Sequence, residues 1–235
     1  MASATGNYSS SFGNQTTASG ASSHAEGVGS AAHSEASHAE GNGTQANGYA
    51  SHAEGIGAYA NGQGSHAEGH GQTGLDATYA HAEGNSTQAN GLYSHAEGNQ
   101  TVASGDGSHS EGGAFFIGSV VSAPNIRTLS DGTTISINST VANGIAAHAE
   151  GAFTLAQGEG SHTEGAGTIA EGNLSHAEGS GTHAIGYASH SEGVGTIALG
   201  VQAHAEGNGT QANGNWSHAE GNDTIAEGEG SHTEG

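Results

Sequence analysis

Histidine and glutamate recur together as His-x-Glu, mostly within Ser-His-Ala-Glu-Gly, and these are the residues of the chain that could do chemistry. A neutral imidazole and a carboxylate can transfer a proton, share a hydrogen bond, or bind a zinc-like ion together. Fourteen such pairs lie in one register within the 235 residues. They are His24/Glu26, His38/Glu40, His52/Glu54, His66/Glu68, His81/Glu83, His95/Glu97, His109/Glu111, His148/Glu150, His162/Glu164, His176/Glu178, His190/Glu192, His204/Glu206, His218/Glu220 and His232/Glu234. So many copies indicate a scaffold, and we expect no enzymatic activity.

The spacing of these pairs predicts the fold. Successive histidines are 14 residues apart, except for a step of 15 from His66 to His81 and one of 39 from His109 to His148. A fixed step of this kind is typical of a solenoid, in which each repeat forms one coil and packs only against the next.

Each repeat has two similar halves, as in residues 37–50, and both follow Ser/Thr-x-Ala-x-Gly. Alternation of small and variable residues indicates a short strand, so we predict an all-β parallel β-roll (a β-solenoid) of 14-residue, two-strand coils. The small first, third and fifth positions share a face and point inward, where stacked Ser and Thr hydroxyls would hydrogen-bond from coil to coil. The second and fourth positions point outward. They form a constant His/Glu face, made of the fourteen pairs, and a variable face on the second halves.

A column of threonines occupies an inward position of the second halves. It consists of Thr168, Thr182, Thr196, Thr210 and Thr224. Outward threonines at this spacing would suggest an ice-binding array, but the alternation directs them inward and argues against it.

Two irregularities interrupt the repeat. One extra residue within 71–80 predicts a bulge. The step of 39 resolves as 14 + 11 + 14, which divides the chain into coils over 1–121, an inserted loop or hairpin over 122–132, and coils over 133–235. The coil before the insertion has an apolar half at 115–119, and the coil after it carries Ile135 and Ile137 in place of His and Glu. The insertion is a tolerated addition, a recognition loop or a trimer clasp.

Composition excludes several classes of function. The formal charge is −22 and Arg127 is the sole basic residue, so we expect neither nucleic-acid binding nor attachment to an anionic membrane. No apolar run is long enough to span a bilayer, and the absence of cysteine excludes thiol chemistry. Residues 1–6 show no signal-peptide pattern. The thin Ala/Ser interior buries little apolar surface, so association should supply stability.

The half-repeat Ser-x-Ala-x-Gly, paired at a 14-residue step, resembles the head repeats of YadA-like trimeric autotransporter adhesins. The His/Glu version is similar to repeats in phage tail appendages. The resemblance implies a left-handed roll and a homotrimer whose second and fourth motif positions, usually Val and Ile, face the trimer centre. Here those positions carry His and Glu, as in His38 and Glu40.

Like charges stacked every ~4.8 Å would repel by roughly 3 to 4 kcal/mol per carboxylate pair, so each Glu needs a partner. We therefore predict that the fourteen His/Glu pairs form a hydrogen-bonded trimer seam, in which carboxylate partners raise the imidazole pKa values. The alternatives are a solvated outer face and a metal site. The metal alternative involves His38, Glu40, His52, Glu54, His176, Glu178, His190 and Glu192. No cofactor is expected apart from metal ions or anions on the trimer axis.

These observations predict a structural or adhesive trimeric rod on a virion tail or a cell surface. Its partners would be further copies of itself and a host receptor or glycan. The lack of a signal-peptide pattern favours a phage appendage over a bacterial adhesin. A head-to-tail extracellular filament is the alternative, because the last repeat stops in mid-coil without a polar cap.

Overall fold

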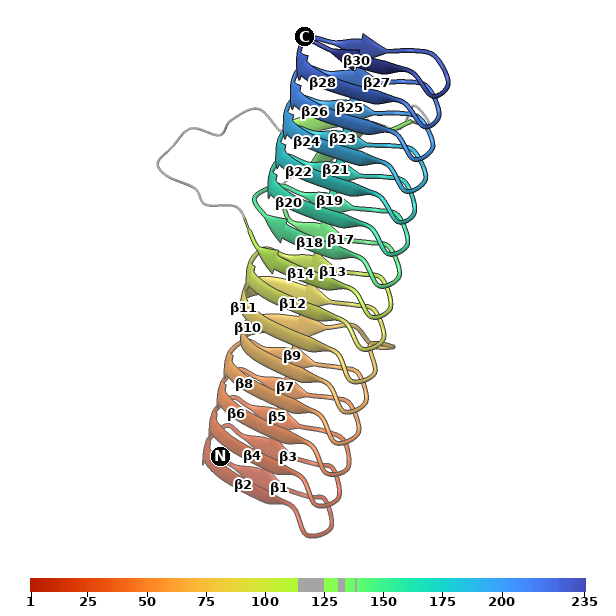
Figure 1. Ribbon diagram of the computed structural model, residues 1–235. Helices are drawn as coiled ribbons and strands as arrows, with labels where there is room; N and C mark the ends of the chain where they lie inside the picture. The colour runs from red at the N-terminus through yellow and green to blue at the C-terminus, as the bar shows by residue number, and fades with distance from the viewer. Residues whose placement is uncertain (114–124, 131–133, 138) are drawn as a thin grey trace, which may run out of the picture. The chain divides into compact units, whose positions relative to one another are not determined.

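The computed structural model describes residues 1–113, 125–130, 134–137 and 139–235, and it confirms an all-β parallel β-solenoid (Figure 1). The chain divides into two compact units, residues 1–107 and residues 108–235. In both units each strand of the roll pairs in parallel with the strand one coil further along. None of the described residues forms a helix that could span a membrane.

In residues 1–107, long strands carrying the first half-repeat alternate with two-residue strands carrying the second, except that β10 and β11 each run through both halves. The long strands are β2 (Ser10–Asn14), β4 (His24–Val28), β6 (His38–Asn42), β8 (His52–Ile56), β10 (His66–Thr73), β11 (His81–Ala89) and β12 (His95–Asn99). The short strands are β1 (Ser3–Ala4), β3 (Thr17–Ala18), β5 (Ala31–Ala32), β7 (Gln45–Ala46), β9 (Tyr59–Ala60) and β13 (Val102–Ala103). Where the step is 15, the pairing of β10 with β11 shifts register between His70 and Gln72, which confirms an irregularity at this point.

Residues 108–235 repeat the same arrangement and add a hairpin. The long strands are β14 (His109–Gly112), β18 (His148–Gly151), β20 (His162–Ala166), β22 (His176–Ser180), β24 (His190–Val194), β26 (His204–Asn208), β28 (His218–Asn222) and β30 (His232–Glu234). The short strands are β17 (Val141–Ala142), β19 (Leu155–Ala156), β21 (Ile169–Ala170), β23 (His183–Ala184), β25 (Ile197–Ala198), β27 (Gln211–Ala212) and β29 (Ile225–Ala226). The hairpin strands are β15 (Asn125–Thr128) and β16 (Thr134–Ile137).

The glycine at the fifth position of the motif is required by close packing of the backbone. Gly41 has φ of +116°, and a Cβ atom there would lie 2.1 Å from the carbonyl oxygen of Gly55 in the next coil. A left-handed backbone position closes each corner of the coil, at Gly43 (φ +70°) and at Ala50 (φ 53°). Of the two glycines, only Gly41 is closed to a larger residue by steric overlap, because nothing lies within 4 Å of a Cβ added at Gly43.

The interior of the roll consists of the small residues that the alternation directs inward. Ala39, Ala46, Ser37 and Thr44 are at most 1% exposed, and equivalent columns continue through each unit. Thr168, Thr182, Thr196 and Thr210 are also buried, which confirms that this column does not form an outward array.

The predicted coil-to-coil bonding is found for some hydroxyls, such as Ser30 with the carbonyl of Gly41, but the serine at the first motif position commonly bonds within its own corner instead. The hydroxyl of Ser51 donates to the carbonyl oxygen of Gly48 at 2.8 Å, within its own corner. The hydroxyl of Thr44 donates to the carbonyl of Glu40 at 3.2 Å, inside the same coil. A backbone carbonyl three or four residues earlier in the chain lies within reach of the hydroxyl, so the local hydrogen bond competes successfully with one to the next coil.

The insertion is larger than expected, and its placement needs correction. β14 pairs directly with β18, with His109 opposite His148, so the roll continues across the step of 39 residues without an intervening coil. β16 pairs antiparallel with β15, with Ile137 opposite Asn125 and Ile135 opposite Arg127. The prediction that residues 133–146 form a complete coil is therefore wrong for 134–137. The alternating sequence of that strand is compatible with a strand of a hairpin as well as with a strand of the roll. The apolar half-coil expected at 115–119 and the boundary at 121 lie outside the described residues.

Candidate functional site

The His/Glu face is a ladder of stacked imidazoles in residues 1–107. The register of β6, β8, β10 and β11 places each ladder histidine opposite the next. The ring centroids of His38 and His52 are 4.7 Å apart and those of His52 and His66 are 4.8 Å apart, with planes within 5° of parallel. At the start of the ladder, His24 meets His38 edge to face at 77°. The interval matches the spacing expected for parallel strands.

Residues 108–235 carry the same ladder over eight long strands. Centroid distances run from 4.9 Å between His109 and His148 to 4.7 Å between His162 and His176. The planes of these pairs are within 8° of parallel, and only the last pair, His218 and His232, tilts by 23°. In each unit the sequence therefore predicted correctly which side chains share this face.

Many of the ladder imidazoles have Nε2 within 4.0 Å of a carboxylate oxygen. The Nε2–Oε2 distance is 3.3 Å for His24 and Glu26, 3.5 Å for His38 and Glu40, and 3.7 Å for His176 and Glu178. A good hydrogen bond to nitrogen spans about 2.7 to 3.2 Å, so most of these contacts are longer than the predicted bonds. The Nε2 atoms of His38, His52, His162 and His176 are buried and have no hydrogen-bond partner.

Glu111 and Glu164 illustrate how the ladder is arranged within a single chain. Oε2 of Glu111 lies 3.9 Å from Nε2 of His109, and its Oε1 lies 4.0 Å from Nε2 of His148. Both distances are too long for a hydrogen bond. Nε2 of His162 has no hydrogen-bond partner, so Glu164 does not accept from it. The charge of Glu164 favours the protonated imidazole, but burial outweighs it and the pKa of His162 is lowered. Both glutamates share the register of the ladder, and their bonding across a trimer seam stays a prediction.

The predicted direction of the imidazole pKa is wrong for six ladder histidines, whose pKa values are lowered: His52, His81, His148, His162, His190 and His204. Burial and the neighbouring imidazoles of His38 and His66 lower the pKa of His52. The same two causes lower the pKa of His81 and of His190. The carboxylates offset only part of this effect at His52, His81 and His190, because burial is the largest cause and the flanking imidazoles add to it.

Successive carboxyl groups are close enough to share protons. A hydrogen bond with Glu97, together with burial and Glu68, raises the pKa of Glu83 to about 7. Burial, with Glu178 as the next cause, raises the pKa of Glu192. The pKa of Glu54 is lowered although burial opposes this, because the Glu40 carboxyl hydrogen-bonds to it and two imidazoles lie nearby. Glu54, Glu83 and Glu192 therefore titrate together with the neighbouring carboxyl groups of the ladder.

Several His/Glu groups have the composition of a metal site. In the group formed by His38, Glu40 and His52, one ligand atom from each residue lies within 4.8 Å of the others. His148, Glu150 and His162 form an equivalent group in the second unit. The side chains of His38 and Glu40 remain 38% and 36% exposed, so solvent reaches them.

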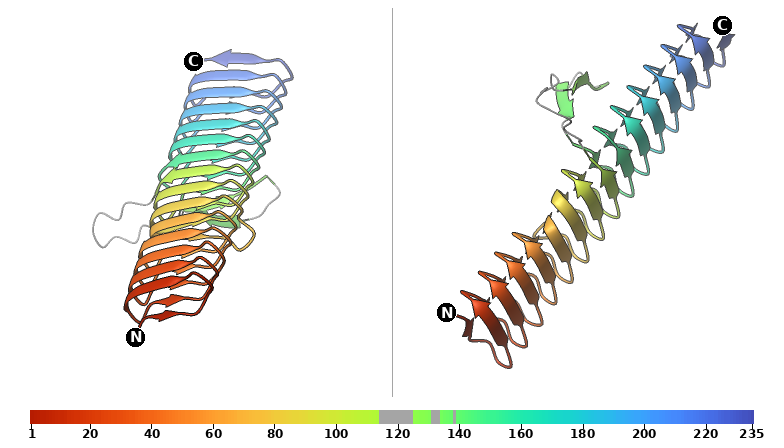
Figure 2. Two further views of the ribbon diagram at one scale, coloured as in Figure 1. Left: turned by 90° about the horizontal axis from the view of Figure 1, so that it is seen from below. Right: turned by 90° about the vertical axis from the view of Figure 1, so that its left-hand side faces the viewer.

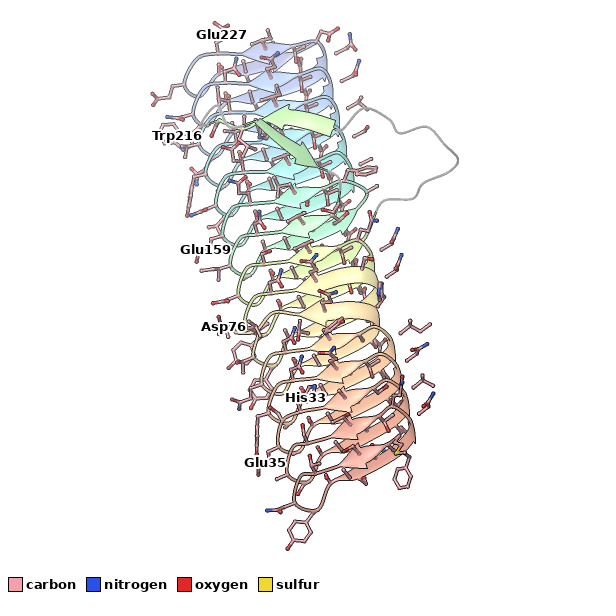
Figure 3. The ribbon with its side chains drawn as sticks, turned by 180° about the vertical axis from the view of Figure 1, so that it is seen from behind. His33, Glu35, Asp76, Glu159, Trp216 and Glu227 are labelled. Carbon is pink, nitrogen blue, oxygen red and sulfur yellow. The ribbon has the colours of Figure 1, made fainter. Side chains whose placement is uncertain are left out.

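The variable face of residues 108–235 carries a feature that the sequence reasoning missed. Leu129, at the end of β15, packs against Leu155 and Ile169, with Val141 and Phe153 beside them. Ile169 is only 1% exposed although it occupies an outward position. Figure 3 shows the hairpin crossing this side of the roll, and Figure 2 shows it standing outside the strands. The signal that could have revealed it is the run of apolar residues at outward positions of β17, β19 and β21.

A polar contact completes the attachment of the hairpin. Both carboxylate oxygens of Glu171 accept from the backbone N–H of Ser130 at 3.0 Å, and Glu171 also accepts from the Ser130 hydroxyl. The Nε2 atom of His183 lies 3.0 Å from Oε2 of Glu171, and these two side chains are 15% and 11% exposed. Beyond the hairpin, a groove of about 270 Å³ lies between Ile169, His183 and Ile197.

The comparisons with known proteins support the architecture. Residues 149–175, 177–203 and 191–210 match the family model of the YadA head domain repeat. A comparison with curated proteins found no match.

Proposed function

The chain carries YadA head domain repeats, and we propose that it forms a structural or adhesive rod on a virion tail or a cell surface, as a homotrimer joined through its His/Glu faces. The rolls would be wound left-handed, as in YadA-like heads. The rod would present its variable faces outward to a host receptor or glycan.

One observation above all supports the choice of face. In residues 108–235 the hairpin occupies the variable face, where Leu129 covers Leu155 and Ile169. A neighbouring chain could not pack against that part of the face without displacing the hairpin. The His/Glu face carries the same pair of side chains in fourteen of the long strands, so one interface geometry can repeat from coil to coil within each unit.

The thin interior gives a physical reason for association. The buried columns consist of Ala, Ser and Thr, and a buried Ala contributes much less transfer free energy than a Leu or Ile. The half-exposed ladder is a second surface that association can bury. Unpaired carboxylates would oppose that burial, whereas imidazoles and shared protons between carboxyl groups reduce the charge that must be desolvated.

Orientation follows from the same choice of face. With the His/Glu faces turned toward one another, the hairpin lies on the outside of the trimer, where it acts as a recognition element. The trimer-clasp reading of the insertion is then disfavoured. The adhesive role rests on this outward hairpin and on the varied side chains around it.

Mass and cross-linking test the proposal together. Light scattering should give about three times the chain mass of 22.8 kDa. The chain has no cysteine, so a single introduced cysteine reports one contact. Glu192→Cys, at the fourth motif position of its half-repeat, should form disulfide-linked dimers in high yield. Leu199→Cys, at the fourth position of the next half-repeat and 47% exposed, is the matched control and should not.

A monomer in solution, or cross-linking confined to Leu199→Cys, would contradict the trimer seam. A scattering mass that grows with concentration beyond the trimer would favour the head-to-tail filament instead.

A further inference from the structure

We propose that the His/Glu ladder binds a row of Zn²⁺ ions, each held by two histidines of successive coils and the glutamate between them. The ligands come from one chain, so this inference does not depend on the trimer. The group of His38, Glu40 and His52 illustrates the argument.

The separation of nitrogen and oxygen is the first reason. Zinc binds imidazole nitrogen and carboxylate oxygen at roughly 2.0 to 2.2 Å, so two such ligands in a tetrahedral site lie about 3.4 Å apart. Nε2 of His38 and Oε2 of Glu40 are 3.5 Å apart, which is long for a hydrogen bond and close to this value. The corresponding distances for His190/Glu192 and His204/Glu206 are both 3.6 Å.

The state of the imidazole nitrogen is the second reason. The Nε2 atoms of His38 and His52 are shielded from solvent and have no hydrogen-bond partner. A buried polar atom without a partner carries a desolvation cost that a bound cation would remove. A neutral imidazole with a free lone pair at Nε2 is the form that binds metal.

Charge is the third reason. The carboxylates of Glu40 and Glu54 are register partners in neighbouring strands, and the chain as a whole carries a formal charge of −22 with one basic residue. A divalent cation beside this row compensates repulsion that no Lys or Arg is present to relieve. Two imidazoles with one carboxylate form a donor set that suits zinc, with a water or a neighbouring chain as the fourth ligand.

The spacing of the rings sets the stoichiometry. The His38 and His52 ring centroids are 4.7 Å apart, whereas two nitrogens on one zinc are at most about 4.2 Å apart, so the rings must tilt toward each other. A ring tilted toward one neighbour moves away from the other, so each imidazole serves one ion. Fourteen ladder histidines at two per ion allow at most seven ions per chain.

Uptake of Zn²⁺ alone by the full-length chain is the test. The purified protein is stripped with a chelator, dialysed against ZnCl₂ and analysed for bound metal, and histidine nitrogen resonances are recorded by NMR. We expect several ions per chain, up to seven, and shifts of the Nε2 resonances. The double variant Glu40→Gln/Glu54→Gln should lose at least one ion per chain and weaken binding in that segment by tenfold or more.

The matched control is Glu35→Gln/Asp76→Asn, which removes the same charge from exposed residues at the edge of the same unit (Figure 3). It should retain full uptake. Less than one ion per wild-type chain, an equal loss in both double variants, or zinc binding without movement of the Nε2 resonances would overturn the inference. The NMR result uses the wild-type chain, so it decides the matter even if the ladder variant folds poorly.

Failure of this inference is distinguishable from failure of the trimer. A trimeric mass in the presence of chelator with no zinc uptake would overturn only the metal site. A monomer that takes up zinc would overturn only the trimer.

Discussion

The Nε2 atom of His66 lies 3.4 Å from Oε1 of Glu54, a residue of the preceding coil. The ladder therefore connects coils through side chains as well as through the backbone of the sheet. A change in one coil of the ladder is felt by its neighbours, which is the expected behaviour of a repeat protein with nearest-neighbour coupling.

Replacing Gly41 with alanine should destabilise the first unit severely. A Cβ at this position would lie 2.1 Å from the carbonyl oxygen of Gly55, and backbone cannot move aside without breaking the sheet. We expect a loss of more than about 3 kcal/mol in the free energy of unfolding, measured by denaturant titration. Gly43→Ala is the control. The added Cβ at position 43 meets open space, so this variant should lose only about 1 to 2 kcal/mol in the free energy of unfolding, because an alanine is strained at positive φ. Equal losses at both positions would show that steric contact between coils is not the cause.

Replacing Glu83 with glutamine should stabilise the chain at alkaline pH and have little effect at acidic pH. The pKa of Glu83 is raised to about 7, so its favourable contribution is complete below the unfolded value of 4.5 and is lost as pH rises through 7. Glutamine resembles the protonated carboxyl and does not ionise. Melting curves in chelator should therefore show a difference between variant and wild type that grows from pH 5 to pH 8. Glu35→Gln, at an exposed corner, provides the comparison, and a difference of the same size there would contradict the prediction.

The lowered imidazole pKa values change the stability with pH in the direction opposite to the raised pKa of Glu83. Neutral His52, His81 and His190 contribute stability that is complete above the unfolded value of 6.5 and is lost as pH falls through the lowered folded values. Between pH 4.5 and pH 6.5, the unfolded pKa values of the carboxyl group and the imidazole, stability gained by the imidazoles as pH rises offsets stability lost by Glu83. For this reason the Glu83 comparison is most informative above pH 6.5, where the imidazoles are neutral in both states.

Trypsin should report the docking of the hairpin. Arg127 is the only Lys or Arg of the chain, and it lies in β15, paired with β16. Leu129→Ala removes the side chain that packs on Leu155 and Ile169, so the hairpin should open more often and cleavage should accelerate by about tenfold or more. The fragments are identified by mass spectrometry. Leu174→Ala, at a position 55% exposed, should leave the cleavage rate unchanged. Unchanged cleavage of Leu129→Ala would mean that this contact does not hold the hairpin.

Much of the fold follows from the sequence because every interaction of a solenoid coil is with the next coil. The step between Ser-His-Ala-Glu-Gly motifs predicts the parallel register, and the alternation predicts that Ala39 is buried while His38 and Glu40 are outward. Each of these inferences concerns residues close in the chain or one repeat apart. The roles of Gly41 and Ala39 could therefore be predicted without knowledge of the packing.

Contacts across several coils could not be predicted in this way. Thr134–Ile137 has the alternation of a roll strand, yet it pairs with Asn125–Thr128, because a hairpin can satisfy the same pattern. Nothing periodic links Ser130 to Glu171, 41 residues later, and their contact depends on where the hairpin folds over the roll.

The amino-acid sequence by itself determined the β-roll, its register and the composition of the His/Glu face, because these depend on a pattern that repeats every coil. The tertiary structure decided which face the hairpin covers. It also decided that Oε2 of Glu111 lies 3.9 Å from Nε2 of His109, because side-chain distances are set by the packing. Finally, it decided that the pKa of His52 is lowered, because burial of the imidazole and the neighbouring imidazoles of His38 and His66 outweigh the carboxylates of Glu54 and Glu68.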